Sequence, residues 1–404
     1  MKGRTLIGII IMISLFLAGC SQGQWIKDGH AFSALLQEEN AVGDIGEDLV
    51  QEVSLPPDLN SIGDLFLYQG RIYFSAYREE GGGLNIIGQR TEQGLYEFDI
   101  SSHALRKLAE PGLPQAIFQS PRVNERWLAF IEIDEENDGV HGYRIRAIDR
   151  GTGQEIEVFA LPPDPVIRDR LPESFGLWGN ELLYAKGKCL HLYDLDQQKD
   201  TLLLEAQDLI LFPELVKNYA IYSLFTDPNP LYLIRISQDA VQELARYERA
   251  WGGKISENWL AFNQSFVPSN GSSKEPQEKM VFCSFRQEAP RTFNREELVQ
   301  SIFKDTLVTS WFDSSKQQTF LYVHQLSDWL FVRLSLASPT SEGKVTYLGS
   351  ASTDGRYLAW SEFDYQNLEP MGARLRYLEK IGTVPIFLSL NCLPECSSNA
   401  GYKK

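Results

Sequence analysis

The stretch that decides the fold reads Arg126-Trp127-Leu128-Ala129-Phe130-Ile131-Glu132-Ile133-Asp134. Two later stretches match it, Asn258-Trp259-Leu260-Ala261-Phe262-Asn263-Gln264 and Arg356-Tyr357-Leu358-Ala359-Trp360-Ser361-Glu362-Phe363-Asp364. Each begins with a polar and an aromatic residue and continues through a short apolar run, a pattern that is typical of a β-strand with one buried face. Recurrence of such a stretch along one chain indicates a repeat architecture.

Weaker copies occur at four further places, and the full set starts at Ile72, Trp127, Leu182, Tyr219, Trp259, Leu307 and Tyr357. Successive copies are separated by about 40 to 55 residues, the spacing of propeller-type repeats. Second strand-like runs follow at residues 94–99, 143–149, 191–196, 231–236 and 374–378. Third runs then close the units at residues 105–108, 155–161, 201–204, 241–244 and 344–348. Gly, Asn and Asp between the runs supply the turns.

Three or four strands in units of this length predict an all-β fold of the β-propeller type. The passages Asn124–Phe130 and Asp354–Trp360 resemble the blade motif of TolB-like and WD40-like propellers. We expect seven blades, with six and eight as the alternatives because the unit near residue 307 is weak. A pair of all-β sandwiches is the other architecture that such strands allow.

The first twenty residues have the features of a lipoprotein signal. Lys2 and Arg4 precede an apolar run, and the run ends in Leu17-Ala18-Gly19-Cys20. A basic start, an apolar run too short to span a bilayer comfortably and a small-residue cleavage site are typical of a secretory signal peptide. The residues that end in Cys20 resemble the bacterial lipobox. This resemblance implies cleavage after residue 19, acylation of Cys20 with palmitate or a similar chain, and anchoring to the cell membrane or the outer membrane.

The remaining chain divides by composition. Residues 21–58 are rich in Gln, Glu, Asp and Gly, so we expect a signal peptide at 1–19, then the acylated Cys20 and a flexible acidic tether at 20–58. The propeller should occupy residues 59–390, and residues 391–404 should form a C-terminal tail. Within the propeller, the run Asn294–Phe303 has an N-cap-like Asn and a Glu at the third helical position, which predicts a short helix between blades.

The chain is strongly acidic. It carries 38 Lys and Arg residues against 54 Asp and Glu residues, for a net charge of −16 at pH 7. Such a surface repels phosphate backbones and anionic headgroups, so we exclude nucleic acid as a partner and expect the lipid to supply membrane binding.

Five cysteines are present. Cys20 is assigned to the lipid. Cys189 and Cys283 lie in strand-like alternations and are expected to be buried free thiols, with a disulfide bond between them as the alternative. Cys392 and Cys396 have no nearby His or third Cys, so zinc is disfavoured, and in an oxidising envelope a local disulfide and free thiols are the two alternatives.

One segment has the spacing of a calcium loop. In Asp134-Glu135-Glu136-Asn137-Asp138-Gly139, alternate oxygens of Asp134, Glu136 and Asp138 could point inward, and the Gly permits a sharp turn. A Glu at the third ligand position is too long, however, and Ile145 stands where the twelfth-position ligand belongs. We therefore prefer a solvated acidic hairpin, with calcium as the alternative, and we expect no other cofactor.

Two tryptophans border glycine turns. Trp178 and Trp251 are candidates for a rim that stacks on a sugar or a peptide, although packing in the core is the favoured interpretation. Glu132 and Glu362 occupy equivalent positions in the repeat, and this symmetry favours a structural role over catalysis.

No catalytic motif stands out: there is no Gly-x-Ser-x-Gly elbow, no phosphate-binding loop and no paired zinc histidines. The first hypothesis is therefore a non-catalytic, membrane-anchored propeller outside the cytoplasm that binds an envelope protein, a peptide or a glycan, or acts as a scaffold. The alternative is a propeller-type envelope enzyme, either a glycan hydrolase or lyase or a quinoprotein.

Overall fold

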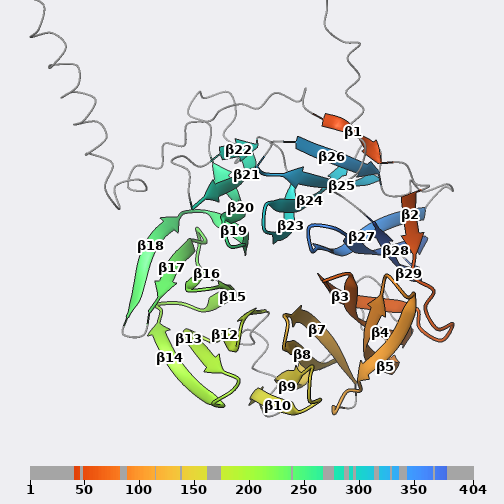
Figure 1. Cartoon of the computed structure of the whole chain (residues 1–404), viewed down its shortest axis with the longest axis horizontal. Helices are drawn as coiled ribbons and strands as arrows, with labels where there is room; N and C mark the ends of the chain where they lie inside the picture. The colour runs from red at the N-terminus through yellow and green to blue at the C-terminus, as the bar shows by residue number, and fades with distance from the viewer. Residues whose placement is uncertain are drawn as a thin grey trace, which may run out of the picture.

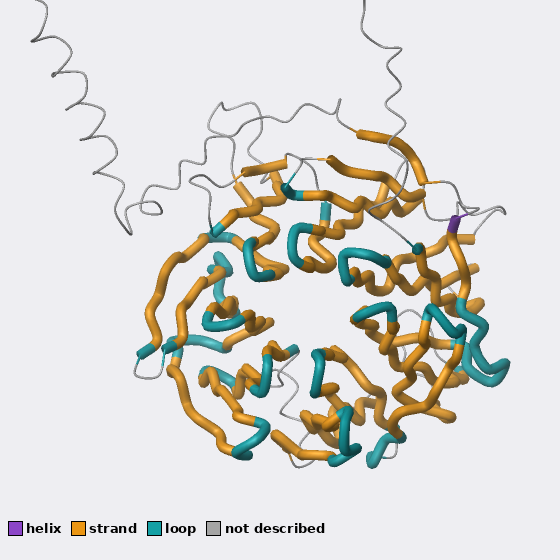
Figure 2. The backbone as a smooth tube through the Cα atoms, in the orientation of Figure 1, coloured by secondary structure: helices purple, strands orange, loops and turns teal. Residues whose placement is uncertain are grey.

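The computed structural model describes residues 41–379 except 46–48, 82–88, 114, 137–138, 162–173, 238–239, 267–276, 286–290, 294–296, 314–317, 328–329, 336–343 and 367–368. Twenty-nine β-strands run through these described residues and form seven sheets. Figure 1 shows the sheets arranged as blades around a common axis, and Figure 2 shows that strands make up most of each blade. The protein is a seven-bladed β-propeller.

Blades 1 to 5 each consist of four consecutive antiparallel strands that run in order from the axis outward. Blade 1 contains β3 (Ser61–Tyr68), β4 (Arg71–Glu80), β5 (Gln89–Asp99) and β6 (Ala104–Ala109), and blade 2 contains β7 (Ala116–Val123), β8 (Trp127–Glu136), β9 (Gly139–Asp149) and β10 (Glu155–Leu161). Blade 3 contains β11 (Phe175–Trp178), β12 (Glu181–Lys186), β13 (Cys189–Asp194) and β14 (Lys199–Glu205). Blade 4 contains β15 (Ile210–Val216), β16 (Tyr219–Leu224), β17 (Leu231–Ile236) and β18 (Val241–Tyr247), and blade 5 contains β19 (Ala250–Ile255), β20 (Trp259–Phe266), β21 (Gln277–Ser284) and β22 (Arg291–Phe293).

Blades 6 and 7 each take an outer strand from the N-terminal part of the chain. Blade 6 contains β23 (Leu298–Phe303), β24 (Thr306–Asp313), β25 (Gln318–Gln325) and β26 (Leu330–Ser335), and β1 (Ala41–Ile45) pairs in parallel with β26. Blade 7 contains β27 (Lys344–Thr353), β28 (Leu358–Gln366) and β29 (Glu369–Leu378), and β2 (Val50–Glu52) pairs antiparallel with β29. The propeller is therefore closed by strands from both ends of the described chain.

These two outer strands correct the predicted extent of the tether. Residues 41–45 and 50–52 lie inside the segment expected to be flexible, yet they belong to sheets. The outer edges of β26 and β29 would otherwise present unpaired backbone N–H and C=O groups, and β1 and β2 satisfy them. Composition could not reveal this pairing because the partner strands lie near the other end of the chain.

The seven copies of the repeat are the second strands of the seven blades, from β4 to β28. One correction concerns their burial, because these strands are covered on both faces rather than one. Leu128 and Phe130 pack with blade 1, whereas Trp127 and Ile131 pack against blade 3. An apolar cluster of this kind fills each of the seven blade-to-blade boundaries among the described residues. The continuous apolar run in the repeat follows from this burial on two sides.

Two predicted elements are wrong. The expected helix at Asn294–Phe303 is instead occupied by β23 from Leu298 onward, because this segment pairs with β24 and Asn263 of blade 5 accepts a hydrogen bond from the Val299 N–H. The run at 344–348, expected to close a unit, is the start of β27 and opens blade 7 next to the axis. In both cases tertiary pairing overrides a local pattern.

The turns between the first and second strands all lie on one face of the propeller, which we call the turn face. Polar contacts join these turns from blade to blade: Trp127 Nε1 donates to Asn180 Oδ1 at 3.1 Å, and Trp259 Nε1 donates to Asp305 Oδ1 at 2.7 Å. The Gly70 N–H donates to Asp354 Oδ2 at 2.7 Å and so links blade 1 to blade 7. The tryptophan of the repeat thus has two roles, since its ring packs in the core and its indole N–H binds the next blade.

Candidate functional site

Several predicted site residues lie outside the described residues, namely Cys20, Cys392 and Cys396. Cys189 and Cys283 are free, as expected, although both are half-buried rather than fully buried. Burial raises the pKa of the Cys283 thiol to about 12, so this thiol is not a nucleophile at neutral pH. In the described part of the chain, no helix is both long enough and apolar enough to cross a membrane.

The acidic segment considered for calcium forms the hairpin between β8 and β9. Asp134 is buried on β8, opposite Gly142, and Glu136 pairs with Gly139 through the backbone. The side chain of Glu136 and all of Asp138 lie outside the described residues, and no cluster of three metal-binding side chains occurs within them. Calcium binding here stays the alternative to the acidic hairpin that the sequence favours.

Trp178 and Trp251 lie toward opposite faces of the propeller. Trp178 ends β11 directly before the turn at Gly179, on the turn face, where it packs against the apolar clusters of blades 3 to 5. Trp251 lies near the start of β19, at the opposite end of an innermost strand. The two rings are half-buried, and the fold does not bring them to one rim.

A pocket of about 380 Å³ lies between blades 1 and 2, and we call it the inter-blade pocket. Its inner wall belongs to the apolar core of this boundary, with Leu108, Leu128 and Ile148 at the base. Farther from the axis the two sheets diverge, as blades of a propeller must, and the facing side chains become polar. The charged residues that line the pocket are Arg71, Arg106, Arg146, Arg150, Glu97, Glu110, Asp149 and Glu155.

Arg150 crosses the boundary from the turn between β9 and β10. Its Nη2 donates to the Tyr73 hydroxyl of blade 1 at 2.8 Å, and its guanidinium carbon lies 5.8 Å and 5.7 Å from the ring centres of Tyr68 and Tyr73. Burial, and next the hydrogen bond that the phenol donates to Glu97, raise the pKa of Tyr73 to about 12. The phenol therefore stays protonated, and it connects Arg150 to the Glu97 carboxylate.

The two walls are held by ion pairs. On blade 1, Glu97 binds Arg106 at 3.0 Å and Arg71 at 3.6 Å. On blade 2, Arg146 binds Glu155 at 2.6 Å and the fully buried Glu132 at 2.7 Å. Because these contacts fix each guanidinium in place, the polar walls are preorganised for a ligand.

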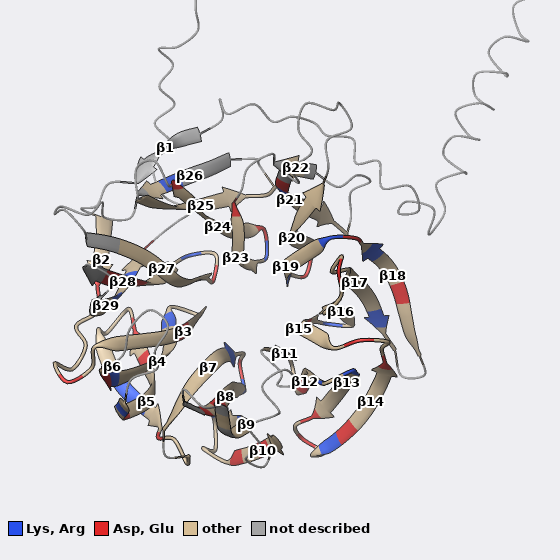
Figure 3. Ribbon diagram, turned by 180° about the vertical axis from the view of Figure 1, so that it is seen from behind, with Lys and Arg blue, Asp and Glu red and all other residues tan. Residues whose placement is uncertain are grey.

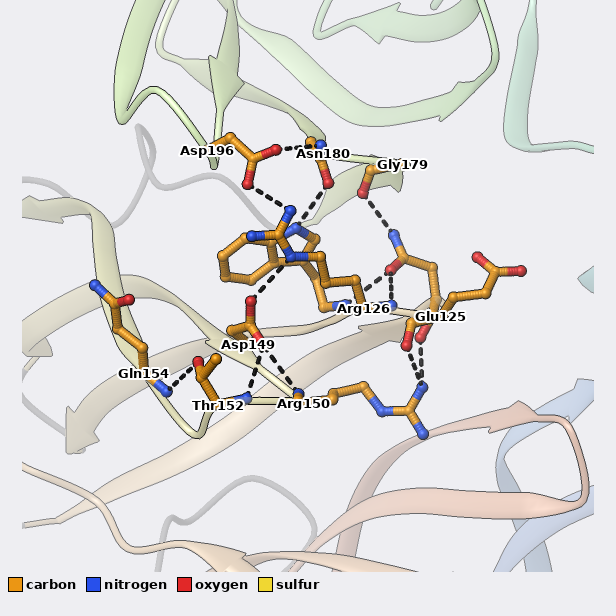
Figure 4. Close-up of polar contacts among 12 residues, drawn as sticks. Glu125, Arg126, Asp149, Arg150, Thr152, Gln154, Gly179, Asn180 and Asp196 are labelled. Atoms are coloured by element: carbon orange, nitrogen blue, oxygen red, sulfur yellow. Dashed lines mark hydrogen bonds and ion pairs between the residues drawn. The ribbon is translucent and has the colours of Figure 1, made fainter.

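The Arg150 turn is also tied to blade 3, as Figure 4 shows. Asp149 accepts hydrogen bonds from the Gly151 and Thr152 N–H groups and from Arg126 Nε at 2.9 Å, and Arg126 in turn reaches Asp196 at 2.6 Å. The hydrogen bond from Arg126, followed by that from Thr152, lowers the pKa of Asp149. The turn that presents Arg150 is thus anchored on both sides.

The pocket combines many hydrogen-bonding groups with little net charge. Four arginines and four carboxylates line it, so their formal charges cancel. Such a wall offers donors and acceptors side by side over a small apolar base. A ligand that both donates and accepts, without a full charge of its own, matches this arrangement best.

No protein-family model matches the chain, and no curated protein matches it either. Solved structures do match. The β-propeller domain of the trilobed protease from Pyrococcus furiosus is 9% identical, with a TM-score of 0.49 over 79% of this chain and 96% of that one. The similarity between the two chains is limited to the β-propeller fold. A chain of a mitotic checkpoint complex is 9% identical, with a TM-score of 0.49 over 82% of this chain and 94% of that one, and an oligogalacturonate lyase in complex with manganese is 12% identical, with a TM-score of 0.48 over 82% and 93%.

Proposed function

We propose that this protein is a lipid-anchored binding protein outside the cytoplasm, and that its propeller holds a polyhydroxylated ligand, such as a segment of an envelope glycan, in the inter-blade pocket. The observation that carries this proposal is the balanced set of arginines and carboxylates in one preorganised cavity. A sugar hydroxyl donates to a carboxylate and accepts from a guanidinium at the same time, while the apolar base can cover a sugar ring's C–H face.

Binding is favoured over catalysis by the state of the pocket carboxylates. Glu97, Asp149 and Glu155 each form an ion pair with an arginine. The hydrogen bond from Arg126 also lowers the pKa of Asp149. A glycosidase needs one protonated carboxyl group as general acid, held beside a second carboxylate. These three carboxylates of the described pocket are instead engaged in ion pairs with arginines, which suits hydrogen-bond acceptors better than a general acid.

The anchor is supported by the sequence around Cys20 and by the position of β1. About twenty residues separate Cys20 from Ala41, and a flexible chain of that length spans roughly 25 Å. β1 lies at the outer edge of blade 6, so the tether joins the propeller at its circumference (Figure 1).

Replacing Cys20 by alanine is expected to abolish acylation and to move the protein from the membrane fraction to the soluble fraction. Fractionation of cells grown with a labelled fatty acid would measure both effects, with the unchanged protein as the control. Retention of the C20A variant in washed membranes at high salt would contradict the proposed anchor.

Replacing Arg150 by leucine is expected to lower glycan affinity at least tenfold, because hydrogen bonds from a charged group contribute about 1.5–3 kcal/mol. The measurement is binding of the detergent-solubilised protein to an array of envelope glycans and peptides, followed by titration of the best ligand. Arg106→Leu, at a largely exposed wall position, tests the same pocket with less effect on the fold.

Arg235 provides a matched control, because its Nη2 also donates to a tyrosine hydroxyl, that of Tyr219 at 3.1 Å, and its guanidinium also covers that ring. It lies on β17 of blade 4, away from the pocket, and Arg235→Leu should leave affinity unchanged. If the array shows no glycan binding, or if Arg150→Leu and Arg106→Leu bind as the unchanged protein does, the pocket assignment is wrong.

A further inference from the structure

Three charged side chains from different blades meet near the propeller axis, and we call them the axis cluster. Arg122 of β7 and Lys254 of β19 both bind Oε1 of Glu214 on β15, at 3.2 Å from Nη2 and 2.6 Å from Nζ. Figure 3 shows these three strands among those nearest the axis. The Arg122 side chain extends from blade 2 past blade 3 to Glu214 of blade 4. The intervening strand β11 is short and lies very close to β15. A Cβ on Gly176 of β11 would meet the Leu215 backbone N at 2.3 Å.

Arg122, Glu214 and Lys254 occupy the same position relative to a β-bulge in their strands. Each of the three strands has a bulge, between Gln119 and Arg122, between Leu211 and Glu214, and between Trp251 and Lys254. In each case the charged residue is the first after the bulge that pairs with the neighbouring strand. A bulge changes the direction in which the adjacent side chains point. The equivalent positions of blades 1, 6 and 7 hold uncharged residues, Leu65, Ser301 and Ala351. At these post-bulge positions, charge therefore occurs only in blades 2, 4 and 5.

The axis cluster carries a surplus positive charge. Burial on its own would raise the pKa of Glu214, but the charges of Lys254 and then Arg122 outweigh burial and lower it. Glu214 is therefore ionised at neutral pH, and two cations face one anion in a chain whose net charge is −16. The nearby Asp64 accepts a hydrogen bond from the Ser120 N–H. Among the described contacts it forms no ion pair with Arg122.

Both cations have hydrogen-bonding capacity left and are partly exposed to solvent, although the Arg122 guanidinium also lies over the Phe66 ring, 5.4 Å from its centre. The side chains of Arg122, Glu214 and Lys254 are 16%, 13% and 26% exposed. An ammonium group has three donors and a guanidinium five. Within the described residues, Lys254 uses one contact to Glu214, and Arg122 uses one to Glu214 and one to the Pro121 carbonyl.

We propose that Arg122 and Lys254 form a second binding site, at the propeller axis, for a single carboxylate group. One carboxylate would neutralise the surplus charge and accept hydrogen bonds from both cations. With Glu214 ionised, the cluster has one positive charge left, which a single carboxylate neutralises, whereas a dianion such as phosphate would leave an excess negative charge beside Glu214. The carboxylate could belong to the C-terminus of a peptide or to a small free acid, and this site does not depend on the inter-blade pocket.

The test is calorimetric titration at low ionic strength with N-acetyl-triglycine, its C-terminal amide, and acetate. We expect the peptide acid to bind and the amide to bind at least tenfold more weakly. Arg122→Met and Lys254→Met should each lower affinity for the acid at least tenfold. Glu214→Gln should raise it at least tenfold, because the internal competitor for both cations is removed.

Lys304→Met is the matched control, since Lys304 is exposed on the turn face and contacts the Phe303 ring. It removes the same charge outside the axis cluster and should leave affinity unchanged. Acetate binding as tight as that of the peptide acid would assign the site to small free acids, whereas weaker acetate binding would assign it to peptide termini. Equal binding of acid and amide, or unchanged binding by both cation variants, would overturn the proposal. The two cation variants decide the matter even if Glu214→Gln fails to fold.

Discussion

Replacing Glu132 by alanine is expected to lower the free energy of unfolding by about 3–5 kcal/mol, the cost of breaking a buried ion pair from one side. The Glu132 side chain is completely buried, and it accepts hydrogen bonds from the backbone N–H groups of Gly112 and Leu113 as well as from Arg146. The variant would leave Arg146, itself buried, with the partly exposed Glu155 as its ion-pair partner and the Phe130 ring as a further contact. Two backbone donors in the link between blades 1 and 2 would also lose their acceptor.

The measurement is the shift of the thermal or denaturant midpoint, and Glu157→Ala is the matched control. Glu157 lies in the same blade and pairs with Arg144 at 3.7 Å, but it is 54% exposed. A surface pair of this kind contributes about 0–1 kcal/mol. Equal midpoints for E132A and E157A would contradict the structural role assigned to Glu132. Glu132→Gln should fall between them, because it keeps an acceptor for the backbone and loses the charge.

Removing the closing strand β2 is expected to have the other large effect. A chain that begins at Ser54 loses the pairs of Val50, Gln51 and Glu52 with β29, and it loses the buried Val53. Three to four backbone hydrogen bonds at about 1 kcal/mol each and one buried valine at about 1.5–2 kcal/mol suggest a destabilisation of roughly 4–6 kcal/mol. Blade 7 would also expose an unpaired edge, so aggregation should rise.

A chain that begins at Gly46 is the control for this truncation. It lacks β1 but keeps β2, so blade 7 remains closed and blade 6 still has four strands. We expect a clearly smaller fall in the unfolding midpoint and little aggregation, measured by calorimetry and light scattering on both chains. If the chain that begins at Ser54 unfolds at the same midpoint as the one that begins at Gly46, β2 does not close the ring in the way the pairing indicates.

The repeat could be predicted because its second strands are covered on both sides. Burial of both faces of β8 and β20 leaves a continuous apolar run that stands out from the surrounding sequence. The same physical constraint applies in every blade, so even the weak copy at Leu307 falls at the start of a second strand. That periodicity predicted seven blades with six and eight as alternatives, and the structure has seven.

The inter-blade pocket could not be predicted in the same way. Arg150 and Tyr73 are 77 residues apart, and nothing local marks them as neighbours. The charges of β5, β6 and β9 follow the ordinary alternation of a half-exposed strand. Only the registers between strands show that Glu97 and Arg146 face one cavity. The stretch Tyr143-Arg144-Ile145-Arg146 held one signal of the pocket. Arginine recurs there inside a strand that the repeat places within a blade, which indicates a polar environment between the sheets.

The wrong predictions share a physical cause. The capping pattern of Asn294–Phe303 and the acidic composition of residues 20–58 are local properties, and both were outweighed by strand edges formed elsewhere in the chain. Leu298–Phe303 pairs with β24, and Val50–Glu52 pairs with β29.

The pairing of β2 with β29 also sets an order of events during synthesis. Gln51 and Tyr377, which are hydrogen-bonded in the closed ring, lie 326 residues apart. The ribosome releases β2 early, and this strand must wait while six blades and most of the seventh are made. Ring closure is then the last step of folding, and until it occurs both β2 and the outer edge of blade 7 can pair with the wrong partner. β2 therefore stays without its partner strand until the rest of the propeller has folded.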